Sequence, residues 1–422
     1  MALESSRKTE TYAIYSESKI QVARMTPSIL ITHPGRQHSH HFALALDEVN
    51  LLKAYWTGVP VADPDTKGLL YRGIAHASPQ PVTSLNENKV HHFYLAPIVR
   101  RIAESVCSPS NQVYINHRAY AWFDRWVALH LSCTIETVSA VVCYENAAKE
   151  TFRVAKKYGL TTILDAASLH HTKQDVLYVP TESKDAHKQI VKIKNEEIDL
   201  SDHIITVSEL ARKSYVEAGV DPKKVSAVPM GVNIESFSCS YKNTNRDRPF
   251  LFLFVGHARQ LKGIDILIEA SNSLIQIGDY HELALAGGIE KKFSDDVDRL
   301  DHVQHMGYLT RSELGEIFRK VDCLVLPSRF DSFGRVVVEA LATGTPVIVS
   351  SNVGAKECIK QGINGWIVKS GSTEALVKRM RWCINHRDKL LSMVGSARRT
   401  AEKYSWRNYR KKIAWKVNLL IT

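Results

Sequence analysis

Two carboxylates, Asp331 and Glu339, lie eight residues apart at positions that folding alone does not explain. Apolar residues recur between and after them at the spacing of one helical face, so we expect a helix to begin just after Asp331. At about 1.5 Å of rise per residue, eight residues span roughly 12 Å. The free N–H groups of the first helical turn lie between the two carboxylates and form a ready site for an anion. A nucleotide sugar matches this order, because it presents sugar hydroxyls, then a diphosphate, then a ribose diol.

An ion pair on a solvated helix face is the alternative interpretation of Glu339. Arg335 precedes Glu339 by four residues, and such a pair contributes only about 0.2–0.5 kcal/mol. However, Arg335 places a positive charge in the first helical turn, which the helix dipole disfavours unless an anion binds nearby. We therefore prefer the ligand interpretation.

A second group of cations follows a strand in the same half of the chain. The apolar run FLFLFVG ends at Gly256, and Arg259 and Lys262 then precede a helix that we expect to begin near Ile264. Two cations beside the free N–H groups of a helix suit a diphosphate better than a single phosphate. The sequence thus predicts two anion-binding helix ends in one domain.

Alternating strands and helices must position these groups. In the first half, strand patterns occur at 28–32, 139–145, 161–168, 203–209 and 225–232. In the second half they occur at 250–256, 282–288, 302–309, 321–326, 347–349 and 364–368. With helical patterns between the strands, this order predicts an α/β protein with parallel sheets and right-handed crossovers. The segment 51–73, in contrast, has the pattern of loops, and 91–106 and 114–131 have helical patterns.

The length of 422 residues favours more than one core. A polar stretch near the middle divides the two alternating halves and is typical of a linker. We predict an N-terminal domain at 1–237, a linker at 238–250, a C-terminal domain at 251–400, and a final helix at 401–422 that packs back toward the N-terminal domain.

Ligand-binding loops are expected at the carboxyl ends of the parallel strands. In the N-terminal half this rule places four residues near a cleft: Glu145, His170, His171 and Ser208. Either histidine could contact a substrate hydroxyl, or could be a satisfied surface histidine.

The loop HPGRQHSHH, residues 33–41, joins the first strand to the first helix. Gly35 would let the backbone approach a ligand closely, and Arg36 and His38 are candidate acceptor contacts, as are Glu145 and His170. A histidine-rich tract can also bind metal. No cysteine or carboxylate accompanies it at ligand spacing, so we prefer a polar contact loop and predict no metal site.

The formal net charge is +11, and much of it comes from the basic segments 378–389 and 396–416. Basic helices with interleaved aromatic residues suit nucleic acid, anionic lipid or phosphorylated ligands, and also occur as solvated faces. No nucleic-acid motif is found, so we predict no nucleic-acid partner. The aromatic and arginine-rich segments 91–106 and 114–131 could likewise meet a membrane-borne acceptor or form a packed interdomain helix pair.

Other compositional features concern the cellular compartment. The seven cysteines form no Cys-x-x-Cys pair. No apolar run approaches the ~18 residues of a transmembrane helix, and the polar N-terminus lacks the apolar region of a signal peptide. We therefore expect a cytoplasmic protein with reduced thiols, at most peripheral to the inner face of a membrane.

Three segments together resemble retaining glycosyltransferases of family 4: residues 204–237, the loop VGHARQLKGIDILIEA (255–270), and PSRFDSFGRVVVEALATGTPVIVSSNVGAKECIKQGINGWIV (327–368). The resemblance is specific in the second half of the chain and looser in the first. It implies the GT-B architecture, in which two Rossmann-like, doubly wound domains face each other across a cleft. The C-terminal domain would bind a nucleotide-sugar donor and the N-terminal domain a carbohydrate, lipid-linked or small-molecule acceptor.

The resemblance also implies roles for individual residues. The family's Glu-x7-Glu motif maps onto Asp331, which would contact the donor sugar, and Glu339, which would contact the ribose. The catalytic candidates are Asp331, Lys262, Arg259 and His171. The donor-binding candidates are Gly35, Gly256, His257, Arg259, Lys262, Gly288, Tyr308, Asp331, Ser332, Phe333, Gly334, Arg335, Val336 and Glu339.

Three departures from the family pattern bear on specificity. Asp331 is one methylene shorter than the usual glutamate. His257 stands where the family has an arginine, and Arg259 could substitute for it. The loop at 33–41 lacks the usual paired glycines.

The implied reaction is glycosyl transfer with retention through an oxocarbenium-like transition state, with the leaving diphosphate stabilised by Lys262, Arg259 and a helix N-terminus. Because no convincing second carboxylate is found for a double displacement, we prefer front-face attack, and expect neither a metal nor another cofactor. A sugar-nucleotide epimerase or phosphorylase of the same fold and a degenerate sugar-nucleotide-binding protein are the alternatives.

Overall fold

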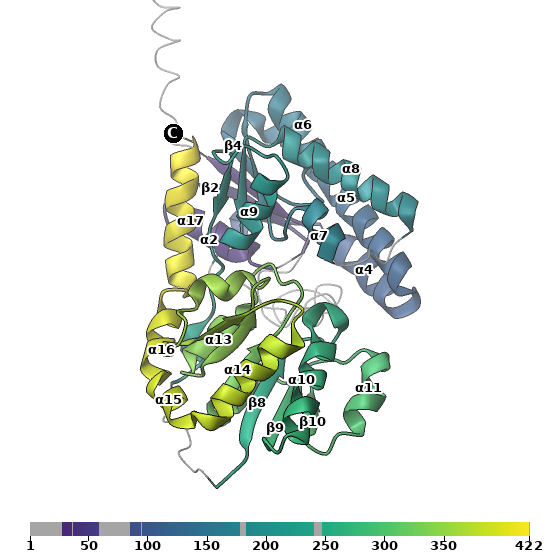
Figure 1. Ribbon diagram of the computed structural model, residues 1–422. Coiled ribbons are helices and arrows are strands. Elements are labelled where there is room, and N and C mark those ends of the chain that lie inside the picture. Colours follow the sequence, from purple (N-terminus) through teal and green to yellow (C-terminus); the bar gives the residue numbers. More distant parts are fainter. Residues whose placement is uncertain are drawn as a thin grey trace, which may run out of the picture.

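The computed structural model describes residues 28–35, 37–58, 85–93, 95–177, 183–239 and 247–421. Within these ranges the chain forms two sheets, of seven and six strands, each flanked by helices (Figure 1). The strand orders are β3-β2-β1-β4-β5-β6-β7 and β10-β9-β8-β11-β12-β13, and the neighbouring strands pair in parallel. The prediction of two doubly wound, Rossmann-like α/β domains is confirmed.

The N-terminal sheet is buried at its centre, where β1 and β4 are covered on both faces. Its strands are β1 (Ile29–His33), β2 (Leu52–Thr57), β3 (Val90–His92), β4 (Ala140–Tyr144), β5 (Thr161–Ala166), β6 (His203–Thr206) and β7 (Val225–Ala227). The strand order reverses between β1 and β4, and in open parallel sheets ligands bind beyond the carboxyl ends of the strands at such a point.

The expectation of loops at 51–73 is wrong for its first residues. Leu52–Thr57 forms β2, which pairs in parallel with β1 and is buried except at Lys53. Its run of apolar residues suits a strand covered on both faces, and burial against β1 decides the conformation. The helix predicted from residue 91 is also wrong at its start, because Val90–His92 pairs with β2 as the edge strand β3.

Helices cover both faces of the N-terminal sheet. They are α2 (Ser39–Asp47), α4 (Leu95–Val106), α5 (Pro109–Thr134), α6 (Lys149–Lys157), α7 (His171–Leu177), α8 (Lys184–Leu200) and α9 (Glu209–Glu217). The segments 91–106 and 114–131, for which we considered a membrane-borne acceptor or a packed interdomain helix pair, contribute to α4 and α5. The helix α5 buries Phe123, Val127 and Leu131 in the core of its own domain. No helix among the described residues is long and apolar enough to cross a membrane.

The C-terminal domain repeats the architecture around one large apolar core. Its strands are β8 (Phe250–Val255), β9 (His281–Ala286), β10 (Val303–Gly307), β11 (Cys323–Leu326), β12 (Val347–Ser350) and β13 (Gly365–Val368). Its helices are α10 (Ile264–Gln276), α11 (Lys291–Asp298), α12 (Arg311–Lys320), α13 (Arg335–Ala342), α14 (Thr373–Asn385), α15 (Arg387–Ser392) and α16 (Val394–Glu402). The order reverses between β8 and β11, so the loops after these strands border the expected ligand site.

The last helix, α17 (Trp406–Ile421), returns to the N-terminal domain and lies alongside it (Figure 1). It packs against α2 and buries Tyr409, Ile413 and Val417 in the core beneath. The chain crosses between the domains twice, and the two crossing segments lie side by side. Val232 N–H donates a hydrogen bond to the Tyr404 carbonyl oxygen at 2.8 Å. A Cβ at Gly231 would lie 2.5 Å from the Trp406 ring, so this close approach requires glycine.

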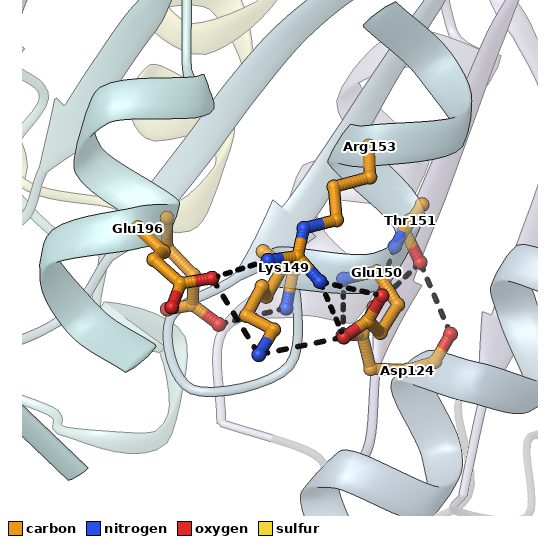
Figure 2. A network of polar contacts seen from close by, with 8 residues as sticks. Asp124, Lys149, Glu150, Thr151, Arg153 and Glu196 are labelled. Atoms are coloured by element: carbon orange, nitrogen blue, oxygen red, sulfur yellow. Dashed lines mark hydrogen bonds and ion pairs between the residues drawn. The ribbon is translucent and has the colours of Figure 1, made fainter. Parts of the chain in front are cut away.

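Carboxylates from two neighbouring helices hold the start of α6, which has no side-chain cap of its own. Asp124 of α5 accepts the N–H groups of Glu150 at 2.7 Å and Thr151 at 3.0 Å, and Figure 2 shows Asp124 beneath this turn. Glu197 of α8 accepts the N–H groups of Asn146 at 2.7 Å and Ala148 at 2.9 Å. These bonds satisfy donors that a helix start otherwise leaves free, and they lock the loop after β4.

We expect Glu197→Gln to lower the free energy of unfolding by about 1–3 kcal/mol, because an amide nitrogen would then face a buried backbone N–H. Burial raises the pKa of Glu197 to about 8 from 4.5. The folded state therefore holds this proton more tightly, so the stability that the carboxyl contributes declines as pH rises from about 4.5 to about 8. The variant should lack this decline in urea unfolding measured across that pH range.

Glu196→Gln is the matched control. Glu196 is the preceding residue, but its carboxylate lies at the surface and pairs with Arg153 at 2.7 Å (Figure 2). An exposed pair contributes about 0–1 kcal/mol, so this variant should change stability little. Equal losses in the two variants would contradict the role given to Glu197.

Candidate active site

The carboxyl edges of the two sheets meet between the domains. Ser208, two residues after the end of β6, donates a hydrogen bond from its hydroxyl to the carbonyl oxygen of Ser332, in the loop after β11, at 2.6 Å. The next residue, Glu209, donates its backbone N–H to the Glu357 carboxylate at 2.9 Å. The predicted ligand loops of the two domains therefore face one another.

One ion pair joins the two predicted anion-binding loops. Lys262 Nζ lies 2.6 Å from Asp331 Oδ2, although the residues are 69 positions apart in the chain. Both side chains keep partial access to solvent, 21% for Lys262 and 17% for Asp331. The lysine immediately precedes α10 and the carboxylate precedes α13, so the pair lies where both helix N-termini begin.

A second clamp between these loops was not predicted from the sequence. Arg329 binds Asp265 in bidentate fashion, at 2.6 and 2.7 Å, and also donates to the Gln260 carbonyl oxygen at 2.7 Å. Its own N–H bonds to the Leu261 carbonyl oxygen at 2.9 Å. The available signals were an arginine three residues after the buried strand β11 and an aspartate in the first turn of α10.

The first turn of α13 is shaped for close approach. Gly334 takes the N-cap position with φ +84° and supplies no side-chain cap. A Cβ there would lie 2.9 Å from Val353 Cγ1, so neither the conformation nor the space admits another residue easily. Phe333 N–H points to Asp331 Oδ1 at 3.3 Å. Arg335 and Val336 then open the helix, where N–H groups and the positive end of the dipole favour an anion.

Glu339 lies one turn further along α13, with 14% of its side chain exposed. Arg335 Nη2 is 3.9 Å from its Oε1, so the i, i+4 ion pair is present at the outer limit of contact and is not a hydrogen bond. Burial raises the pKa of Glu339, and Arg335 and Arg311 oppose that rise. This carboxylate is therefore largely desolvated, and the Arg335 and Arg311 charges favour its ionised form.

A third group lies at the ends of β8, β9 and β10. Gly256 and Gly287 approach so closely that a Cβ at Gly287 would lie 2.3 Å from the Gly256 carbonyl oxygen. A Cβ at Gly288 would lie 2.6 Å from Tyr308 Oη and 2.8 Å from His257 Nδ1, so these three residues form one cluster. The Tyr308 ring is 82% exposed and available for contact.

Arg259 lies apart from the ion pair. It is exposed and forms the extended N-cap of the short helix Gln260–Lys262. Its carbonyl oxygen accepts the Lys262 N–H at 2.8 Å, so the backbones of the two predicted cations are fixed relative to each other.

On the N-terminal side, the loop after β1 turns inward. Gly35 N–H bonds to His33 Nδ1 at 2.8 Å. His38 is buried, and its Nε2 lies 2.9 Å from Asp165 Oδ1. The Tyr409 ring of α17 packs edge-on against the His38 ring, with 6.2 Å between the ring centroids. His38 thus links three elements of its own domain. Arg36 lies outside the described residues.

The other acceptor-side candidates are also buried. Ser168 donates its hydroxyl to Glu145, whose pKa is raised by burial. His170 Nδ1 contacts Thr172 Oγ1 at 2.8 Å, and burial lowers the pKa of His170 to about 4. His171 lies against it, with 4.1 Å between ring centroids, and lines with Glu145 a cavity of about 10 Å³. Burial lowers the pKa of His171 as well, so both rings are predominantly neutral near pH 7.

Comparison with known proteins gives the class of the C-terminal domain. Residues 240–400 match the family model described as glycosyl transferases group 1, so this part of the chain is a glycosyltransferase group 1 domain. The chain is 26% identical over 274 residues to D-inositol 3-phosphate glycosyltransferase 1 of Catenulispora acidiphila, covering 60% of this chain and 65% of that protein. It is 29% identical over 231 residues to an uncharacterized glycosyltransferase of Methanocaldococcus jannaschii, covering 49% and 57%. The chain thus spans between about half and two thirds of the length of these relatives.

Solved structures resemble the whole two-domain arrangement. Sucrose-phosphate synthase from Thermosynechococcus elongatus has a TM-score of 0.65 at 16% identity, covering 93% of this chain and 98% of that one. Anabaena HepE, solved in complex with UDP-glucose, has a TM-score of 0.61 at 18% identity, covering 93% and 99%. The fold is therefore that of GT-B glycosyltransferases, as the resemblance implied.

Proposed function

We propose that this protein is a retaining glycosyltransferase of family 4 that moves a sugar from a nucleoside-diphosphate sugar to an acceptor hydroxyl. The observation that carries the proposal is the Lys262–Asp331 pair at the adjoining N-termini of α10 and α13, in the domain that matches the group 1 family model. It joins a phosphate-binding cation to a carboxylate that can accept sugar hydroxyls, at the carboxyl edge of the sheet.

The donor would lie along α13. Its diphosphate would contact Lys262, Arg259 and the N–H groups of the first turn, with the sugar at Asp331 and the ribose at Glu339. Tyr308 and His257 would lie toward the base. The largely desolvated Glu339 carboxylate suits a diol, because two hydroxyl groups can donate hydrogen bonds to it.

In the proposed step, the bond between the anomeric carbon and the phosphate oxygen breaks as the acceptor oxygen bonds to that carbon from the same face. The acceptor proton passes to the departing phosphate oxygen. Lys262 and the helix N-terminus stabilise the charge that develops there, which is commonly the largest contribution to such catalysis. His171, being neutral and within the N-terminal domain, would position sugar or acceptor hydroxyls and would not act as a cation.

A thermal-shift panel of uridine, guanosine and adenosine diphosphate sugars tests donor binding. HepE is described in complex with UDP and UDP-glucose, so we expect the uridine compounds to protect most. At a hundred times the dissociation constant, a ligand adds about 2.7 kcal/mol to stability. Glu339→Gln should weaken this protection and lower turnover sharply, whereas Glu316→Gln, an exposed glutamate of α12, should change neither.

The outcomes separate the alternatives. A new glycoside among the products supports transfer, and an altered sugar nucleotide supports epimerisation. Donor protection without transfer or hydrolysis for any sugar nucleotide would favour a degenerate binding protein. The family likeness and the ion pair both favour transfer.

We propose that the reaction needs no metal and no other cofactor. Lys262, Arg259 and two helix N-termini can together neutralise a diphosphate. Transfer should therefore continue in EDTA at its original rate. Activity lost in EDTA and restored by manganese would disprove this proposal.

We also propose peripheral contact with anionic membranes through the outer face of α17. Trp415 and Leu419, one turn apart, are 67% and 56% exposed. Lys412 and Lys416 lie beside them and line a pocket of about 560 Å³ between α17, α9 and β7, together with Arg212 and Lys223. Exposed apolar side chains flanked by lysines are typical of interfacial helices.

Flotation with phosphatidylglycerol-containing vesicles tests this contact. The wild type should float, and the double variant Lys412→Glu/Lys416→Glu should not. Lys188→Glu/Lys192→Glu, an exposed i, i+4 lysine pair on α8, is the matched control and should float like the wild type. Equal behaviour of the two double variants would remove α17 from the proposal.

A further inference from the structure

The single hydroxyl group of Ser208 forms hydrogen bonds in both domains. Within the N-terminal domain it is the N-cap of α9, where Oγ accepts the Ala211 N–H at 3.1 Å. Across the domain boundary the same oxygen donates its proton to the Ser332 carbonyl oxygen at 2.6 Å. The side chain is fully buried, so water cannot replace either bond. The family motif and the ion pair do not account for this contact.

Ser332 follows Asp331 in the short segment that leads into the first turn of α13. Its peptide unit continues into Phe333, whose N–H points back to Asp331 Oδ1 at 3.3 Å. The orientation of the Ser332 carbonyl group therefore determines how the donor loop presents the carboxylate and the N–H groups that follow. Ser208 holds that carbonyl from the opposite domain.

Gly354 completes this junction. A Cβ at this position would lie 2.1 Å from the Ser332 carbonyl oxygen and 2.7 Å from Ser208 Oγ. Gly354 N–H in turn bonds to the Asp331 carbonyl oxygen at 2.9 Å. Absence of a side chain is what permits Ser208 to reach the donor loop.

A second bond lies beside the first. Glu357, three residues after Gly354, accepts the Glu209 N–H at 2.9 Å at the start of α9. Arg212 holds the Glu209 side chain at 2.9 Å, which directs that carboxylate toward its own helix. The N-terminus of α9 is thus bonded to two parts of the C-terminal domain, the donor loop and the segment after β12.

We propose that Ser208 is a positioning residue, through which the N-terminal domain orders the donor loop when the two domains meet. The loop would present Asp331 and the first turn of α13 correctly only while Ser208 holds the Ser332 carbonyl group. The part that concerns turnover rests on the proposed function. The part that concerns loop order does not.

The simplest competing explanation is that Ser208 only caps α9. Ser372 provides the matched control, because it caps α14 in the same way, accepting the Ala375 N–H at 3.2 Å, and the two variants lose the same kind of bond. Ser208→Ala should change the donor loop, and Ser372→Ala should not.

Amide hydrogen exchange of the ligand-free protein measures loop order directly. The Asp331 and Val337 amides, on either side of Ser332, bond to the carbonyl oxygens of Asn352 and Gly334 at 3.0 Å each. We expect Ser208→Ala to speed exchange of these two amides by roughly tenfold, since the buried bond it removes would otherwise oppose local opening. Ser372→Ala should leave these amides at the wild-type rate. Unchanged exchange in Ser208→Ala would overturn the proposal.

Gly354→Ala disturbs the same Ser208–Ser332 contact from the other side. It tests the proposal if Ser208→Ala does not fold. Its methyl group should displace the Ser332 carbonyl group and speed exchange at the same amides. Because both changes break one contact, the double variant should show less than the product of the two single effects. Fully independent effects would contradict a shared junction.

Kinetics then links loop order to transfer. In the active enzyme, Ser208→Ala should lower kcat roughly ten- to a hundredfold, and by a larger factor than the donor KM rises, because misplaced groups cost rate more than affinity. Ser372→Ala should retain wild-type kcat and KM. Faster exchange with no loss of kcat would overturn the link to turnover. If the wild type transfers no sugar from any sugar nucleotide while the exchange result holds, the proposed function fails and the ordering role of Ser208 stands.

Discussion

The ion pair between Lys262 and Asp331 joins two helix N-termini that would otherwise repel each other. Both α10 and α13 begin at the carboxyl edge of the C-terminal sheet, and each carries the positive end of its dipole there. Lys262 and Arg259 add further positive charge. One carboxylate at 2.6 Å from Lys262 Nζ offsets part of this charge and fixes the distance between the loops. The bidentate pair of Arg329 with Asp265 is a second link between the same two loops.

The N-terminal domain uses its ionisable groups differently. His38, Asp165, Glu145 and Glu197 are buried, and their described partners belong to the same domain. In a low-dielectric interior such groups need well-placed partners, and these bonds hold the loops that follow the strands. The histidine-rich loop therefore packs into the core of this domain, where His38 contacts Asp165 and the Tyr409 ring of α17. At the start of α9, Ser208 and Glu209 form hydrogen bonds to the C-terminal domain.

Much of the C-terminal site could be predicted because its signals are local. Buried strands in parallel sheets are short apolar runs, and helix starts are marked by glycine and polar residues within a few positions. This is why Gly256, Lys262 and Asp331 could be assigned to the ends of particular elements, and Glu339 to the helix that follows Asp331. The N-terminal half was harder. The strand β2 has no alternating pattern, and only its pairing with β1 shows that Leu52–Thr57 is extended.

The sequence by itself determined the class of fold, which is two alternating α/β halves. It also determined where the candidate donor-binding residues lie relative to strand and helix ends, because periodicity and helix-end chemistry depend on near neighbours. Only the tertiary structure decided which distant residues meet. Lys262 reaches Asp331, Arg329 reaches Asp265, and Ser208 reaches Ser332 across 124 positions of sequence. It also decided that His38 points inward to Asp165. Such contacts depend on how two sheets and two domains pack, and no short-range pattern encodes that packing.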